Sequence, residues 1–402
     1  MAGPAGDERA LVAGGGIAGL ATAIALARHG VATCVLEKRA ELAEAGAGIQ
    51  IGPNGVHVLA DLGIRDQLAA LAGVPASIRV RQGHTGTELA RLPLGSWIVA
   101  RHGAPYWTLH RHDLHAALLA RARSEPLIEV RAGFEVANVA QDRASISVFD
   151  GAGRSVRGFA LIGADGIGSA VRAHMLGPVA HTFSGKTATR AVVPAGAISS
   201  SIEPGDVGLW LSPGAHVVHY PVRGGSEVAV VAIIDEALDV QAWNTPADPA
   251  ALLDRLEGFE PTLRRALAEA PHWHKWALVD ARPLQRWSDG RIALAGDAAH
   301  PVLPFLAQGG VLALEDAVVL AEALAGHRSD PAQALAAYAG ARRARAKRVQ
   351  AASRANGRVY HLFGPARLAR NAALRLTPGR ALMATYDWLY GWRHGAAERN
   401  PT

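Results

Sequence analysis

The chain has little cysteine and no long apolar run. Its 402 residues include one cysteine, Cys34, which excludes an intramolecular disulfide, a CxxC redox pair and a thiolate metal cage. Even the apolar stretch 292–325 carries Asp297, His300 and Asp316, so no segment is expected to cross a membrane. The first residues lack a basic segment followed by an apolar one. We therefore expect no secretory signal and a cytoplasmic protein.

Acidic residues are outnumbered, since 41 Lys and Arg oppose 35 Asp and Glu and give a net charge of +6. The densest basic cluster, 342–348, falls in a predicted helix without interleaved aromatic side chains. We interpret it as a solvated helix face and expect no nucleic-acid partner. His272 and His274 have no neighbouring set of carboxylates or cysteines, so no metal site is predicted.

Glycine occurs at informative places, beginning with a predicted βαβ unit. Apolar residues 10–13 precede a helical pattern that ends at His29-Gly30, and residues 32–37 are apolar and β-branched up to a final acid. The intervening turn fits GxGxxG, whose free N–H groups and helix dipole bind a pyrophosphate. The residues expected to do so are Gly14, Gly16, Ile17, Ala18 and Gly19.

Glu37, at the end of the second strand, is placed to accept hydrogen bonds from ribose hydroxyls. An acid at this position disfavours the 2′-phosphate of NADP, which leaves NAD or FAD. Asp297 follows a predicted strand, 291–295, and its carboxylate could bind a polyol such as the ribityl chain of FAD. Gly309 and Gly310 lead into a predicted helix whose N-terminal amides can face the flavin. Asp165, in Gly163–Gly166, either belongs to the same site or forms only an Asx turn.

The glycine turn with Glu37, the segment Gly163–Gly166 and the segment Gly296–Pro301 resemble the three fingerprints of class A flavoprotein monooxygenases, the FAD-dependent aromatic hydroxylases. The resemblance extends over essentially the whole chain. The resemblance implies an α/β fold in which a Rossmann-type FAD-binding domain carries an inserted β-sheet substrate domain and a C-terminal helical region. We expect the FAD-binding domain at 1–75, 101–180 and 281–340, the substrate domain at 76–100 and 181–280, and the helical region at 341–402. Further FAD contacts implied by the resemblance are Lys38, Arg39, Gly48, Gln50, Arg111 and Val136.

Within that family the chain looks most similar to 3-hydroxybenzoate 6-hydroxylases and to salicylate and 6-hydroxynicotinate hydroxylases. The resemblance puts Tyr106, His216 and Tyr220 in the substrate pocket, while Pro304 stands where the 3-hydroxybenzoate enzymes place a glutamine. Independently, the two-residue period of a strand puts His216 and Tyr220 on one face, where they could help to remove a phenolic proton. The alternative is that both side chains are structural and only form hydrogen bonds at a sheet edge.

The resemblance implies that NADH or NADPH reduces FAD, that dioxygen forms a flavin C4a-hydroperoxide, and that its distal oxygen is transferred to a small phenolic aromatic acid. One alternative is a flavin-dependent halogenase or reductase of the same fold, although the Trp-x-Trp-x-x-Pro element of halogenases is absent. A second is a non-enzymatic protein that only holds FAD. The sequence leaves open the exact substrate and the oligomeric state, a homodimer included.

Overall fold

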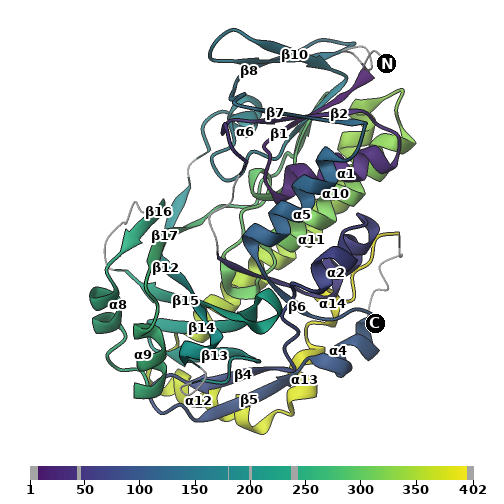
Figure 1. Cartoon of the computed structure of the whole chain (residues 1–402). Helices are drawn as coiled ribbons and strands as arrows, with labels where there is room; N and C mark the ends of the chain where they lie inside the picture. The colour runs from purple at the N-terminus through teal and green to yellow at the C-terminus, as the bar shows by residue number, and fades with distance from the viewer. Residues whose placement is uncertain (1–7, 43–46, 180, 199–201, 237–242, 396–402) are drawn as a thin grey trace.

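The computed structural model describes residues 8–42, 47–179, 181–198, 202–236 and 243–395. Two sheets organise the chain, one at the top and one at the lower left of Figure 1, and long helices run between them. In the described part of the chain no helix combines the length and apolar character that a membrane span needs.

The first sheet has the strand order β18-β19-β11-β1-β2-β7 and is parallel except at β18. Its two central strands, β1 and β11, are fully buried, as expected of a parallel sheet covered on both faces. Ala13 pairs with Gly163, so the loops that follow β1 and β11 leave the sheet side by side. The strand bounds are β1 (Ala10–Ala13), β2 (Thr33–Glu37), β7 (Ile128–Ala132), β11 (Ala160–Gly163), β18 (Ser288–Asp289) and β19 (Ile292–Leu294).

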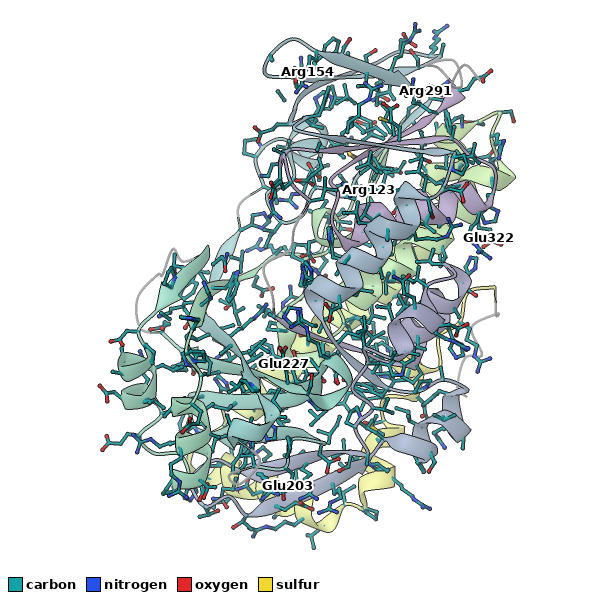
Figure 2. All side chains as sticks on the ribbon, viewed as in Figure 1. Arg123, Arg154, Glu203, Glu227, Arg291 and Glu322 are labelled. Carbon is teal, nitrogen blue, oxygen red and sulfur yellow. The ribbon has the colours of Figure 1, made fainter. Side chains whose placement is uncertain are left out.

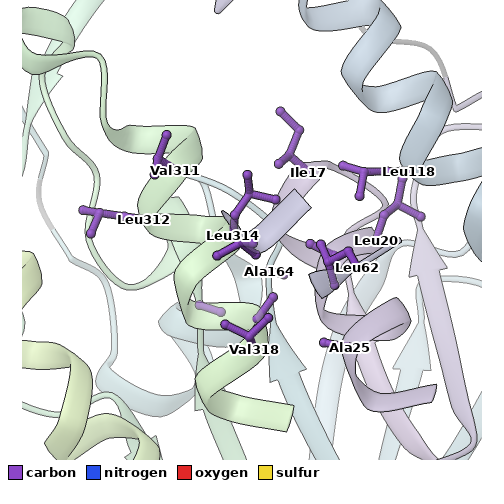
Figure 3. Close-up of a cluster of buried hydrophobic side chains, with 14 of the residues drawn as sticks. Ile17, Leu20, Ala25, Leu62, Leu118, Ala164, Val311, Leu312, Leu314 and Val318 are labelled. Atoms are coloured by element: carbon purple, nitrogen blue, oxygen red, sulfur yellow. The ribbon is translucent and has the colours of Figure 1, made fainter. Parts of the chain in front are cut away.

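Helices α1 (Ile17–Arg28), α5 (Arg111–Arg123), α10 (Gly309–Gly326) and α11 (Pro331–Tyr360) pack beside this sheet. Figure 3 shows the buried cluster to which α1 and α10 contribute, with Ile17, Leu20 and Leu314 among its side chains. All three side chains are buried, and α10 is apolar around most of its circumference. A helix of that kind belongs in the interior, which explains why α10 lies between α1 and α11.

The second sheet has the order β16-β17-β12-β15-β14-β13-β4-β5 and is antiparallel except where β13 meets β4. Helices α8 (Pro249–Arg255) and α9 (Pro261–Ala268) cover its outer face through a core that includes Val217, Val230 and Trp273. The bounds are β4 (Ser77–Gln82), β5 (Glu88–Pro93), β12 (Thr182–Pro194), β13 (Val207–Ser212), β14 (Ala215–Val222), β15 (Glu227–Asp235), β16 (Trp243–Ala247) and β17 (Trp273–Asp280).

Smaller elements complete the fold. A three-stranded sheet, β8–β10, lies beyond the first sheet near Arg154 and Arg291, at the opposite end of the molecule from Glu203 (Figure 2). The remaining elements are α2 (Pro53–Asp61), α3 (Arg65–Ala69), α4 (Gly95–His102), α6 (Ala170–Leu176), α7 (Ala195–Ile198), α12 (Gly364–Leu376), α13 (Gly379–Ala384), α14 (Asp387–Tyr390), β3 (Gly48–Ile51), β6 (Trp107–His110), β8 (Val136–Gln141), β9 (Ile146–Asp150) and β10 (Ser155–Gly158).

Two sequence-based expectations were wrong, the second only in part. The sequence pattern of residues 75–110 predicts extended segments that alternate with turns, but α4 forms there and is followed by Gly103, whose φ is +74°. The basic cluster was expected to be a solvated helix face. Arg343, Lys347 and Arg348 are indeed exposed, but Arg342 and Arg345 of α11 are buried against Glu315 and Asp316 of α10. The expected βαβ unit is confirmed as β1–α1–β2.

Candidate active site

The glycine loop after β1 is closely packed against the loop after β11. A Cβ atom on Gly14, whose φ is +103°, would lie 2.4 Å from the carbonyl oxygen of Ala164. A Cβ atom on Gly19 would lie 1.9 Å from the carbonyl oxygen of Gly14. Glycine is therefore required at both positions, which holds the N-terminus of α1 close to the sheet edge.

The acid at the end of β2 faces this loop. The Glu37 carboxylate accepts hydrogen bonds from the backbone N–H groups of Gly15, at 2.7 Å, and Arg39, at 3.0 Å. His115 of α5 lies with Nε2 2.8 Å from the carbonyl oxygen of Gly15 and so donates to it. His115 could not be predicted, because no local sequence pattern distinguishes a functional histidine on a helix. The side chains of Lys38 and Arg39 are exposed, and Val136 begins β8 half-buried.

Asp165 follows β11, and its environment favours a ligand partner. One carboxylate oxygen accepts a hydrogen bond from the N–H group of Val171 at 3.2 Å. The other is buried and has no hydrogen-bond partner among the described residues. Burial raises the pKa of Asp165. A buried carboxylate oxygen without a partner is costly, so we expect a bound hydroxyl or amide group to satisfy it.

Arg172 connects the segment around Asp165 to the segment around Asp297. Its guanidinium donates to the carbonyl oxygens of Ile167 and, at 3.0 Å, of Ala298. The side chain of Asp297 is exposed, whereas Gly296 and Ala298 are buried. The two motifs that are far apart in the sequence are thus held together at the edge of one sheet.

His300 has a structural role near this edge, as a hydrogen-bonding residue rather than an acid or base. Its Nε2 lies 2.5 Å from the Asp316 carboxylate, which also accepts a hydrogen bond from the backbone N–H group of Gly296 at 3.0 Å. Burial lowers the pKa of His300, but the adjacent Asp316 charge outweighs burial and raises it overall. The contact with Asp316 therefore fixes the imidazole to α10.

These residues suit a flavin dinucleotide. The N–H groups of the glycine loop can bind a pyrophosphate, and the carboxylates of Glu37 and Asp297 can accept hydrogen bonds from hydroxyl groups. The buried oxygen of Asp165 adds an unused acceptor. At the N-terminus of α10, a Cβ atom on Gly309 would meet nothing within 4 Å, so a ring can approach that backbone closely.

The strand β3 packs against the inner face of the second sheet. A Cβ atom on Gly48 would lie 2.4 Å from the Tyr220 ring and 2.5 Å from Cβ of Ala229. The hydroxyl of Tyr106 donates to the Gln50 side chain at 2.7 Å, and Gln50 also hydrogen-bonds Tyr220. Burial raises the pKa of Tyr220 to about 12, so its hydroxyl keeps its proton at neutral pH.

His216 lies on the same strand face as Tyr220, as the two-residue period predicted, and is only 1% exposed. Its ring contacts Phe305, next to the half-buried Pro304, with centroids 5.6 Å apart, and Tyr360 at 5.2 Å. Its Nδ1 lies 2.7 Å from Nε2 of His361. Burial holds the pKa of His216 well below its usual value, so the imidazole is neutral at neutral pH.

Three residues on or beside this sheet face were not singled out from the sequence: Tyr360 and His361, at and just after the end of α11, and Arg190 of β12. Arg190 aligns with Val231 and Val218 across the sheet, which puts it on the face of His216 and Tyr220. Its guanidinium lies 5.0 Å from the Trp276 ring centroid, and its Nε has no hydrogen-bond partner in the described ranges. Burial lowers the pKa of Arg190. No local sequence pattern marks this residue.

Arg111 begins α5, and its N–H group donates to the carbonyl oxygen of Ala47 at 2.7 Å, next to Gly48. A Cβ atom on Gly310 would lie 2.7 Å from Cδ1 of Ile49. The expected residues Gly48, Gln50, Arg111 and Gly310 therefore all lie around β3. Across the described residues, no cluster of His, Cys, Asp and Glu could hold a metal ion.

Comparisons with known proteins agree with this geometry. The family described as "FAD binding domain" matches residues 7–353. The chain is 38% identical over 392 residues to the 3-hydroxybenzoate 6-hydroxylase of Polaromonas naphthalenivorans (strain CJ2), covering 97% of each protein. HpxO of Klebsiella pneumoniae, solved with FAD and uric acid, has a TM-score of 0.85 at 26% identity, with 94% of this chain and 95% of HpxO covered.

A salicylate hydroxylase substrate complex has a TM-score of 0.81 at 25% identity, with 97% of each chain covered. These matches extend over nearly the whole chain, so they include both sheets. They confirm the predicted fold class and the FAD cofactor. The chain belongs to the FAD-binding-domain family, and it is an FAD-dependent monooxygenase of the aromatic hydroxylase type.

Proposed function

We propose that this enzyme hydroxylates a small hydroxybenzoate-like acid, with dioxygen as co-substrate and NADH or NADPH as electron donor. One observation carries the proposal: a neutral, buried His216 shares a sheet face with Tyr220 and with the cation Arg190. A proton acceptor and a cation on one face suit a substrate that has both a phenol and a carboxylate. The similarity to 3-hydroxybenzoate 6-hydroxylase supports the same substrate class.

In this proposal the chain's own residues bind and ionise the substrate. FAD held by the glycine loop, Glu37 and Asp297 would supply the reducing equivalents that activate dioxygen. His216 accepts the phenolic proton and makes the ring more electron-rich, while Arg190 pairs with the carboxylate. Tyr106 and Tyr220, joined through Gln50, hold one wall of the pocket in place. The aromatic side chains around His216 exclude water from the reacting atoms.

We propose as FAD contacts the residues expected from the sequence, and as substrate contacts Tyr106, His216, Tyr220 and Pro304. The division into domains is also a proposal. It is supported by strand membership, because the six-stranded sheet draws only on 1–75, 101–180 and 281–340. The eight-stranded sheet draws only on 76–100 and 181–280.

The test is NADH consumption by the purified holoenzyme with 3-hydroxybenzoate, salicylate and 6-hydroxynicotinate, with hydroxylated product and hydrogen peroxide measured in parallel. We expect one compound to stimulate consumption and to yield product with little peroxide. Stimulation that yields mostly peroxide would identify that compound as a mimic. If no aromatic acid stimulated consumption, the proposed substrate class would be wrong.

The His216→Ala variant tests the role of the proton acceptor. Loss of a positioned base lowers rates by about 10²–10⁴-fold, and we expect a fall of that order in product formation with FAD affinity unchanged. His219→Gln is the matched control, because His219 is buried on the opposite face of the same strand. Equal turnover of His216→Ala and the control would remove His216 from the chemistry.

A further inference from the structure

A continuous line of side chains connects the buried end of the pocket with the surface. Nδ1 of His216 lies 2.7 Å from Nε2 of His361, and Nδ1 of His361 lies 2.7 Å from Oδ1 of Asp235. Exposure rises along this line. The residues His216 and His361 are 1% and 7% exposed, whereas the Asp235 side chain is 45% exposed. Both nitrogens of the His361 ring are therefore engaged, one toward the pocket and one toward solvent.

The outer end of this line is an ion pair. The ammonium group of Lys186 on β12 contacts the Asp235 carboxylate and lies 3.1 Å from Nδ1 of His361. Burial raises the pKa of Asp235, but the hydrogen bonds from His361 and Lys186 outweigh burial and lower it overall. An ionised Asp235 orients the His361 ring with its Nδ1–H toward the carboxylate, which leaves Nε2 free to accept a proton from His216.

We infer that His361 is a proton-relay residue that takes the phenolic proton of the substrate from His216 and delivers it to solvent at Asp235. This inference rests on the proposed function, since it assumes a phenolic substrate beside His216. The phenolic O–H bond breaks as His216 gains a proton, and His216 releases its Nδ1 proton to Nε2 of His361. His361 then releases its Nδ1 proton to Asp235 and water, so one proton enters the line and one leaves.

The surroundings of His216 explain why a relay is needed. Phe305 and Tyr360 enclose the ring, and Lys186 adds a positive charge nearby. A proton retained on His216 would be a buried charge beside a second cation, which is unfavourable. Moving the proton through His361 to Asp235 removes that charge from the interior. The groups that face His361 are His216 on β14, Lys186 on β12 and Asp235 on β15, and its ring also contacts Phe305.

The test follows ionisation of 3-hydroxybenzoate bound to the oxidised holoenzyme, recorded as phenolate absorbance after a rapid pH jump, in wild type, His361→Ala and His361→Gln. We expect both variants to form phenolate at least tenfold more slowly, at the lower end of the effect of a positioned base, with the dissociation constants of FAD and 3-hydroxybenzoate unchanged. Added imidazole should restore the rate in His361→Ala, because the cavity opens toward the partly exposed Asp235. His219→Gln should ionise the ligand at the wild-type rate.

A ring-fluorinated 3-hydroxybenzoate that is already a phenolate at the assay pH provides the internal comparison. Its turnover should be equal in wild type and His361→Ala, because no proton then needs to leave. Unchanged ionisation in both His361 variants would overturn the relay while the hydroxylase function stands. Slow ionisation that imidazole does not restore would also overturn it, in favour of a packing role. Since ionisation is read without turnover, a wild type that ionises 3-hydroxybenzoate but does not hydroxylate it would contradict the proposed function alone.

Discussion

At the scale of single residues, the contact between β3 and the eight-stranded sheet depends on Gly48. The strand β3 rests directly on Tyr220 and Ala229, and a methyl group at Gly48 would lie within 2.5 Å of both. These neighbours are side chains packed in the core, so neither can move far. The absence of a side chain at Gly48 therefore sets the distance between the expected flavin region and the sheet that carries His216.

We predict that Gly48→Ala destabilises the protein by about 1–3 kcal/mol, the usual cost of overpacking, and weakens binding of the aromatic acid. Urea unfolding and ligand titration measure the two effects. Gly340→Ala is the control: Gly340 is exposed in the middle of α11 with nothing within 4 Å of a Cβ atom. That change should stabilise by up to about 1 kcal/mol. A Gly48→Ala protein as stable as wild type would contradict the packing argument.

At the scale of elements, α10 and α11 are joined by buried charges. Arg342 donates to Glu315 and to Asp316 at 2.7 Å each, and Arg345 donates to Glu315 at 2.6 Å. Burial raises the pKa values of both acids, but the arginines, and His300 at Asp316, outweigh burial and lower them. Both carboxylates are therefore ionised in the interior. This network connects the longest helix to the one that begins at Gly309.

We predict that Arg342→Met destabilises the protein by about 3–5 kcal/mol at neutral pH, since it leaves buried carboxylates short of a partner. The pKa of Asp316 is lower in the folded protein than in the unfolded chain, so its ionised form stabilises the fold at any pH above the unfolded pKa. This stabilisation decreases as the pH falls below the unfolded pKa and is lost as the pH passes the folded pKa. The difference in free energy of unfolding between wild type and Arg342→Met should therefore shrink below about pH 4. Urea unfolding across pH measures it. Arg343→Met, at an exposed neighbour, should change stability by less than about 0.5 kcal/mol, and an equal loss there would contradict the network.

The elements differ in how well the sequence predicted them. The β1–α1–β2 unit was predictable because its glycines, its helical period and Glu37 all lie within thirty residues and are encoded locally. Helix α4 was missed because Trp97, Ile98 and Val99 favour a strand, and only packing selects the helix. The burial of Arg342 was missed because its partners lie on another helix. His361 and Arg190 were missed for the same reason, since their contacts form only in the folded chain.

At the scale of the whole molecule, three distant segments share one expected ligand. Arg172 joins the segment of Asp165 to that of Asp297, and the loop of Gly14 packs on Ala164. A ligand that contacts all three stabilises the entire chain, because it binds only the folded state. At a concentration of 100 times the dissociation constant, this effect is about 2.7 kcal/mol.

We therefore predict that FAD raises the melting temperature of the apoprotein and that FMN, which lacks the adenosine half, raises it less. Asp297→Ala should reduce the FAD effect, and Asp289→Ala, an exposed acid on the edge strand β18, should not. Calorimetry of each variant with and without the nucleotides measures the shifts. An equal effect of FMN and FAD would contradict a site that uses the glycine loop.

The order of strands in the six-stranded sheet has a consequence for how the protein is made. Strand β11 lies between β1, near the start of the chain, and β19, near residue 294. Strand β4 pairs with β13, more than a hundred residues later, in the other sheet. Neither sheet can close on the ribosome until most of the polypeptide has emerged, so long-range pairing limits the rate of folding. A nascent chain stopped before residue 294 would expose the edge of β11, where chaperones would be expected to bind.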